Sequence, residues 1–164
     1  MKHIVGNGLL APKGVFVQGC NAQGVMGSGI AKEIKSMHPE VFEIYKRAER
    51  EKGLKLGSVS YLEVRPDFII VNGITQEFYG REPGRVYVSY GAIESVFEQA
   101  GKLAKEFNLP LIFPLIGSGL GGGDWKVISE IINRVVDSSV EKILYTLEPM
   151  HEDRRIVSRQ QKLF

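Results

Sequence analysis

Cysteine is nearly absent from this 164-residue chain, in which Cys20 is the only one. One thiol cannot form an internal disulfide, and no Cys/His cluster has the spacing of a zinc site, so we expect no bound metal and a reducing compartment. The longest apolar runs, such as residues 109–116, are of strand length. The amino terminus also lacks the charged-then-apolar pattern of a secretory signal. We therefore expect a cytoplasmic protein with no membrane partner.

Neither sign of charge is in excess. The chain has 21 Lys and Arg against 19 Asp and Glu, a net charge of +2, which argues against the broad positive surface of a dedicated nucleic-acid binder. The basic residues between positions 46 and 55 alternate with glutamates and indicate a solvated helix face. At this length and with 43% apolar residues, the chain can bury a core without disulfides. We predict a single domain over residues 1–164, present as a monomer.

Glycine, in contrast, is abundant: the chain has 19, where average usage predicts about eleven or twelve. Many fall in two clusters, Gly19, Gly24, Gly27 and Gly29 in the first, and Gly117, Gly119, Gly121, Gly122 and Gly123 in the second. Each cluster lies between a strand-like apolar run and an amphipathic helical pattern. Neither is therefore a flexible linker, and their placement indicates function.

Strand and helix patterns alternate along the chain. Strands are expected at residues 14–20, 59–64, 68–75, 109–116 and 142–147, and helices at residues 30–36, 39–52, 90–107 and 125–137. Pro66-Asp67 predicts a hairpin, Pro114 should end its strand or form a bulge, and Asp124 should cap the last helix. The charged residues 151–162 are expected to form a solvated end. This order predicts an α/β fold, a three-layer domain with a central mixed sheet.

The two glycine clusters predict an anion site. In a parallel sheet, both loops emerge at the carboxyl ends of the strands. Glycines let the backbone approach a ligand closely, and the free amides of a helix start attract an anion. Two such loops on one edge indicate a diphosphate, with tight strand-to-helix turns as the alternative interpretation.

Three common motifs fail their context tests. The second cluster contains Gly-x-Gly-x-x-Gly, but no acidic residue ends the strand that follows, as a dinucleotide site requires. Neither cluster has the Lys-Ser/Thr of a P-loop. Ser28 and Ser118 each have glycine on both sides, whereas a nucleophile elbow needs glycine two residues away on each side. The sequence thus argues against a Rossmann site, ATP hydrolysis and α/β-hydrolase chemistry.

Further evidence comes from residues 21–31 (Asn-Ala-Gln-Gly-Val-Met-Gly-Ser-Gly-Ile-Ala), from His38-Pro39-Glu40, from Tyr45 and from residues 114–120 ahead of Trp125. At these positions the sequence resembles the macro domain family, which binds ADP-ribose. The resemblance extends over about residues 4–147. It is closest to the branch that contains ADP-ribose 1''-phosphate phosphatases and terminal ADP-ribose protein glycohydrolases. It implies a macro-domain α/β/α sandwich, in agreement with the pattern of elements.

The resemblance also implies roles for particular residues. The diphosphate would lie between two sets of backbone groups, Gly27, Ser28, Gly29 and Ile30 on one side and Gly117, Ser118, Gly119, Leu120 and Gly121 on the other. Asn21 would hydrogen-bond the hydroxyls of the distal ribose and act in catalysis. Asn7 would accept a hydrogen bond from the adenine amino group. Tyr145 or Leu147 would contact the face of the adenine, with ordinary core packing as the alternative for the tyrosine.

The expected chemistry is limited by what this chain lacks. Where the glycohydrolase branch has a lysine and an acid, this sequence carries Gln76 and Gly121, so we expect no lysine adduct. His38, Glu77 and Asp124 are the remaining acid–base candidates. Two hypotheses follow: a hydrolase that releases ADP-ribose from ADP-ribose 1''-phosphate or from ester linkages, and a non-catalytic reader of ADP-ribose. The expected partners are ADP-ribose or a derivative, including ADP-ribosylated protein or nucleic acid, and no cofactor is implied.

Overall fold

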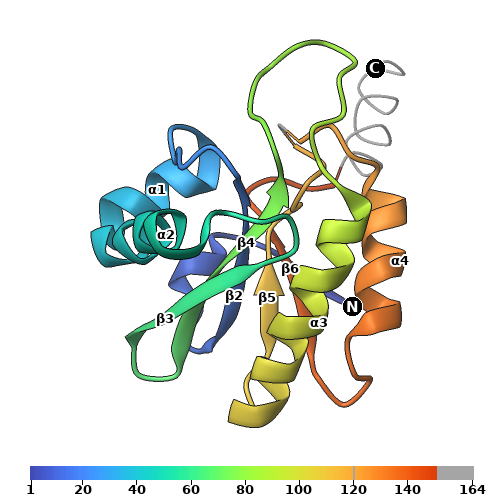
Figure 1. Ribbon diagram of the computed structural model, residues 1–164. Coiled ribbons are helices and arrows are strands. Elements are labelled where there is room, and N and C mark those ends of the chain that lie inside the picture. The colour runs from blue at the N-terminus through green and yellow to red at the C-terminus, as the bar shows by residue number, and fades with distance from the viewer. Residues whose placement is uncertain (120, 151–164) are drawn as a thin grey trace, which may run out of the picture.

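The computed structural model describes residues 1–119 and 121–150, in which a six-stranded mixed sheet lies between two pairs of helices (Figure 1). The strands are β1 (Lys2–Val5), β2 (Gly14–Asn21), β3 (Val59–Arg65), β4 (Phe68–Gln76), β5 (Leu111–Phe113) and β6 (Lys142–Thr146). The helices are α1 (Gly29–Met37), α2 (Pro39–Lys52), α3 (Tyr90–Phe107) and α4 (Trp125–Val135), with a short 3-10 helix η1 at Gly8–Leu10. The predicted three-layer α/β architecture is confirmed.

The sheet has the strand order β1-β6-β5-β2-β4-β3. Every neighbouring pair is parallel except β3 and β4, which form the predicted antiparallel hairpin. Asp67 makes that turn with a positive φ of 59°, a conformation that Asp tolerates better than most residues. The carboxyl ends of β2, β4, β5 and β6 therefore lie on the same edge of the sheet.

The central strands are apolar on both faces because helices cover both faces. In β2, Val15 and Val17 belong to the core under α3 and α4, whereas Phe16 belongs to the core under α1 and α2. The same alternation continues in β4, where Ile69 faces one core and Ile70 the other. A continuous apolar strand is what a doubly covered parallel sheet requires.

Some predicted boundaries were wrong. Residues 109–116 contain only a three-residue strand, since Pro110 precedes it and Pro114 ends it, as the missing proline N–H donors require. The last helix ends at Val135, before Asp137, because the Asp137 carboxylate instead accepts from the Ser139 amide in a turn. Strand β1 was missed, because it is a short edge strand whose residues are mostly exposed. The segment 151–162 lies outside the described residues.

Gly73 in β4 allows α3 to pack closely on the sheet. A Cβ at this position would lie 2.4 Å from Cγ1 of Val96, which is fully buried in α3. We expect Gly73→Ala to lower the free energy of unfolding by about 1–3 kcal/mol through overpacking. Adding Val96→Ala should recover part of that loss, as measured by urea denaturation. Strictly additive losses in the double variant would show that this contact does not limit the packing.

Candidate functional site

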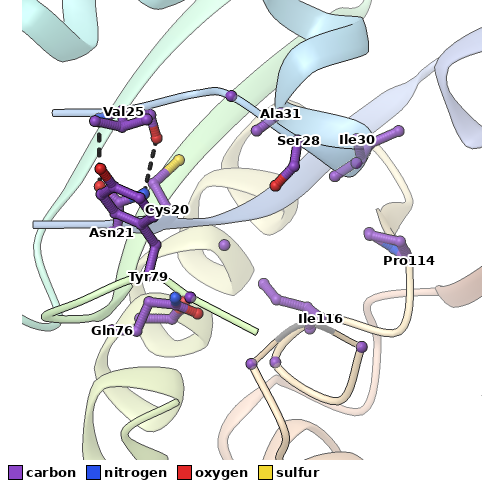
Figure 2. Close-up of a pocket in the computed structure, with 18 of the residues that line it drawn as sticks. Cys20, Asn21, Val25, Ser28, Ile30, Ala31, Gln76, Tyr79, Pro114 and Ile116 are labelled. Atoms are coloured by element: carbon purple, nitrogen blue, oxygen red, sulfur yellow. Dashed lines mark hydrogen bonds between the residues drawn. The ribbon is translucent and has the colours of Figure 1, made fainter. Parts of the chain in front are cut away.

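A cavity of about 670 Å³ opens at the carboxyl edge of the sheet (Figure 2). Its floor comes from the ends of β2 and β4, with Asn21 and Gln76 paired across the two strands. The two glycine loops form its sides. The residues that line it are Gly19, Cys20, Asn21, Val25, Gly27, Ser28, Gly29, Ile30, Ala31, Thr75, Gln76, Tyr79, Gly80, Arg81, Pro114, Leu115, Ile116, Gly117, Gly119 and Gly121. Both loops thus meet at one site, as the sequence predicted.

The first turn of α1 lines the cavity. Ser28 is the N-cap residue, but its side chain makes no capping hydrogen bond, and the first turn has no acidic residue. The amides of Gly29, Ile30 and Ala31 have no acceptor within the helix because they belong to its first turn. All three residues line the cavity, as do Gly27 and Ser28. This helix start can bind an anion.

The second glycine loop lies opposite. Gly117 has a φ of 76°, and Gly119 and Gly121 also line the cavity. Ser118 is not among the lining residues, and its hydroxyl donates to the Leu115 carbonyl at 3.0 Å. Leu120 lies outside the described residues. Asp124 caps α4 by accepting from the Lys126 amide, as predicted, so this helix start is already satisfied by a carboxylate.

Asn21 is buried and holds the first loop in place. Its Oδ1 accepts from the amides of Gln23 at 3.0 Å and Val25 at 3.3 Å, and its Nδ2 donates to the Val25 carbonyl at 2.8 Å. The Tyr45 hydroxyl, on α2, donates to the Asn21 carbonyl at 2.5 Å and lies 3.1 Å from Oδ1. These contacts leave one Nδ2 hydrogen, so the carboxamide can offer a ligand a donor at a fixed position.

Cys20 lines the cavity as a neutral thiol. Its side chain is buried, and burial raises the pKa of the thiol well above its ordinary value. The thiol is therefore protonated at neutral pH. Burial likewise raises the pKa of Tyr45, which stays a neutral hydrogen-bond donor.

Two residues assigned to adenine by the resemblance lie outside the cavity lining. The Oδ1 of Asn7 accepts from the Leu9 amide at 3.0 Å and caps η1, and its Nδ2 donates to Glu33 Oε1 at 2.9 Å. Tyr145, on β6, packs against the core under α1 and α2. Their contact with adenine stays a prediction.

The candidate acid–base residues do not meet in the cavity. His38 lies at the join of α1 and α2 and faces Glu40, with Nδ1 3.4 Å from Oε1. Glu77 is exposed and Asp124 serves as a helix cap. Within the described residues, the lining contains no carboxylate and no lysine, while Gln76 and Gly121 do line it. The described residues likewise contain no group of three or more His, Cys, Asp or Glu able to hold a metal.

Two lining residues, Val25 and Thr75, were not among the predicted site residues. Residues 76–81 follow a strand and mix polar with aromatic residues, a pattern that predicts the rim of the distal-ribose pocket. Gln76, Tyr79, Gly80 and Arg81 of this segment line the cavity. None of the described helices is long and apolar enough to cross a bilayer.

No family model matches the sequence. Among curated proteins, the DNA ADP-ribosyl glycohydrolase of Mycobacterium tuberculosis is 28% identical over 130 residues, which are 76% of this chain and 35% of the relative. The DNA ADP-ribosyl glycohydrolase of Thermus aquaticus is 26% identical over 159 residues, which are 94% of this chain and 42% of the relative. The chain therefore spans well under half the length of these relatives.

Solved structures show the same architecture. A protein of unknown function from Bacteroides thetaiotaomicron has a TM-score of 0.80 and 22% identity, covering 89% of this chain and 97% of its own. The macrodomain of Thermus aquaticus DarG has a TM-score of 0.73 and 25% identity, and the match covers 90% of this chain and 97% of that one. Thermosipho africanus DarTG, solved in complex with ADP-ribose, has a TM-score of 0.74 and 20% identity, and the match covers 94% of this chain and 43% of that one. The chain thus has the macrodomain fold, and among its curated relatives are DNA ADP-ribosyl glycohydrolases.

Proposed function

We propose that this protein binds ADP-ribose in the cavity at the carboxyl edge of the sheet. The observation that carries the proposal is the uncapped first turn of α1, which faces a second glycine loop across a cavity of about 670 Å³. Two sets of backbone groups can then hold a diphosphate without a charged side chain. The Thermosipho africanus structure, of the same fold, holds ADP-ribose.

The proposed orientation follows from the lining. The diphosphate lies between residues 27–31 and Gly117, Gly119 and Gly121. The distal ribose lies at the end where Asn21, Gln76 and Tyr79 gather, which Figure 2 shows across the cavity from Pro114. The remaining Nδ2 hydrogen of Asn21 can donate to a ribose hydroxyl there.

We propose further that the protein hydrolyses the bond between the distal ribose and an attached group. Water adds across that bond, releasing ADP-ribose together with phosphate or a carboxylic acid. Phosphate and carboxylate are good leaving groups, so their release needs little acid–base help. This suits a cavity whose described lining holds no carboxylate or lysine. The cavity would act by orienting the ribose through Asn21. The curated relatives named DNA ADP-ribosyl glycohydrolases support hydrolysis of an ADP-ribosyl linkage in general.

A reader without turnover is the second candidate. The same lack of a carboxylate and a lysine among the described lining residues favours it, because no described side chain there can act as a general base or a nucleophile. Binding measurements alone do not separate the two candidates. Turnover of defined substrates does.

The diphosphate assignment predicts that Gly119→Glu prevents ADP-ribose binding. A Cβ at Gly119 would meet no heavy atom within 4 Å, and its φ is not in the left-handed region, so the backbone accepts a side chain. The added carboxylate would repel the diphosphate. We expect isothermal titration to show at least a tenfold loss of affinity, about 1.4 kcal/mol.

Gly91→Glu is the matched control for that variant. Gly91 lies exposed in the first turn of α3, outside the cavity lining. It should keep wild-type affinity for ADP-ribose. Unchanged affinity in a folded Gly119→Glu protein would mean that the second loop does not contact the diphosphate.

A comparison of Asn21→Ala with Tyr45→Phe tests whether Asn21 acts on the substrate. Tyr45→Phe removes one support of the loop and keeps the carboxamide. Asn21→Ala removes the carboxamide itself, which should cost about 1–3 kcal/mol in binding. Turnover should fall on the order of a hundredfold, because the anomeric centre shifts. The assays are phosphate release from ADP-ribose 1''-phosphate and cleavage of an ester-linked ADP-ribosyl group.

The two variants give distinct outcomes. If Asn21 orients the ribose, kcat falls much further in Asn21→Ala than in Tyr45→Phe. Equal losses of kcat in both variants would mean that Asn21 only supports the loop. Tight ADP-ribose binding by the wild type without turnover of either substrate would refute the hydrolase and leave the reader.

A further inference from the structure

Arg81 is the one charged side chain among the described residues that line the cavity. It lies on the loop that joins β4 to α3, residues 77–89, which is the long green loop that arches above the sheet in Figure 1. A guanidinium keeps its positive charge throughout the physiological pH range. The diphosphate site proposed above uses backbone groups of the two glycine loops, so it leaves this cation without a role.

The second arginine of the loop is already occupied by its neighbours. Nη1 of Arg85 lies 3.3 Å from Oε2 of Glu82, and the guanidinium lies 4.7 Å from the centroid of the Tyr87 ring. Within residues 1–119 and 121–150, the Arg81 guanidinium makes no ion pair and stacks on no ring. Arg81 is therefore available to a ligand, whereas Arg85 is not.

Tyr87 fixes the backbone on both sides of Arg81. Its hydroxyl accepts from the Glu82 amide at 3.2 Å, and its ring packs on Gly80, where an added Cβ would collide with the hydroxyl. The Tyr87 amide in turn donates to the Gly121 carbonyl at 2.8 Å. The position of Arg81 at the cavity thus comes from its two neighbours in the chain and not from contacts of its own side chain.

The charge of Arg81 belongs to one end of the cavity. Gln76 and Tyr79 lie with Asn21 at the end that the proposed orientation gives to the distal ribose (Figure 2). Arg81 follows Tyr79 by two residues and lines the same cavity. A group attached to the distal ribose therefore meets a positive charge, with no described carboxylate in the lining to neutralise it.

A guanidinium distinguishes the two kinds of attached group considered above. Its planar fork donates two parallel hydrogen bonds to two oxygens of a phosphate, and these bonds are strengthened by charge. A phosphate monoester carries about −1.5 to −2 charges at pH 7, whereas an acyl ester is neutral. An unpaired guanidinium therefore favours the phosphate over the acyl group.

We propose that Arg81 is the specificity-determining residue of this cavity and selects a phosphate on the distal ribose over a neutral group. The inference rests on the proposed binding of ADP-ribose. In this arrangement Asn21 orients the ribose, and Arg81 holds two oxygens of the phosphate attached to it. ADP-ribose 1''-phosphate is then the preferred substrate, and an ester-linked ADP-ribosyl group is the poorer one.

The test uses the phosphonate analogue of ADP-ribose 1''-phosphate, in which a methylene replaces the bridging oxygen. The analogue keeps the negative charge and cannot be hydrolysed at that bond. Isothermal titration gives the affinities for the analogue and for ADP-ribose. The wild type should bind the analogue at least tenfold more tightly than ADP-ribose. Arg81→Gln should remove most of this preference and leave the affinity for ADP-ribose unchanged, because backbone groups hold the diphosphate.

Two further variants control for charge and for geometry. Arg47→Gln removes the same charge from an exposed position on α2, outside the cavity lining, and should leave both affinities unchanged. Arg81→Lys keeps the charge without the planar fork, so it should keep only part of the preference for the analogue.

The outcomes separate the two proposals. Equal affinity of the wild type for both ligands, or a preference that survives in Arg81→Gln, would overturn the role of Arg81 and leave the cavity assignment intact. An equal loss of both affinities in Arg81→Gln would place the guanidinium on the diphosphate and would also overturn this role. Failure of the wild type to bind either ligand would refute the proposed function and the inference with it.

Discussion

The site depends on the first turn of α1 being left without a side-chain cap. Unpaired amides at a helix start cost free energy unless water or a ligand accepts from them. Ser28 does not fold back to cap the turn, Gly29 has a positive φ of 58°, and the residues of this turn line the cavity. Helix α4 shows the alternative, since Asp124 caps it. The unsatisfied start of α1 is therefore the part of the cavity where an anionic ligand gains the most binding free energy.

The rest of the site fixes the position of that helix start relative to the surrounding loops. Asn21 closes the turn that leads to Val25, and Tyr45 ties the same residue to α2. The Gly121 carbonyl accepts from the amides of Tyr87 and Val88, which joins the second glycine loop to the loop between β4 and α3. Among the described residues these supports are backbone groups and neutral side chains, together with the Lys46 ammonium, which donates to the Gly24 carbonyl at 3.3 Å. This composition suits recognition and orientation of a diphosphate ligand, and it limits chemistry to bonds that need little acid–base help.

Sequence patterns predicted most of the fold because burial on both faces leaves a clear signal. The apolar runs in β2 and β4 and the apolar face of α3 follow directly from this burial. The glycine loops were also predictable, since a close backbone approach needs glycine, and the resemblance to macro domains pointed to Asn21 beside the first loop. What the sequence did not show depends on tertiary position. The exposed edge strand β1 has little apolar patterning, and the side chain of Asn7 is held by Leu9 and Glu33.

The central claim is that the first turn of α1 receives the diphosphate, and a 15N-labelled NMR titration with ADP-ribose tests it most directly. The amides of Gly29, Ile30 and Ala31 should shift as ligand is added, together with that of Gly119 across the cavity. The amide of Lys126, which Asp124 already caps, should stay where it is and serves as the internal control. Binding that leaves the three α1 amides unshifted, or that shifts Lys126 instead, would contradict the account.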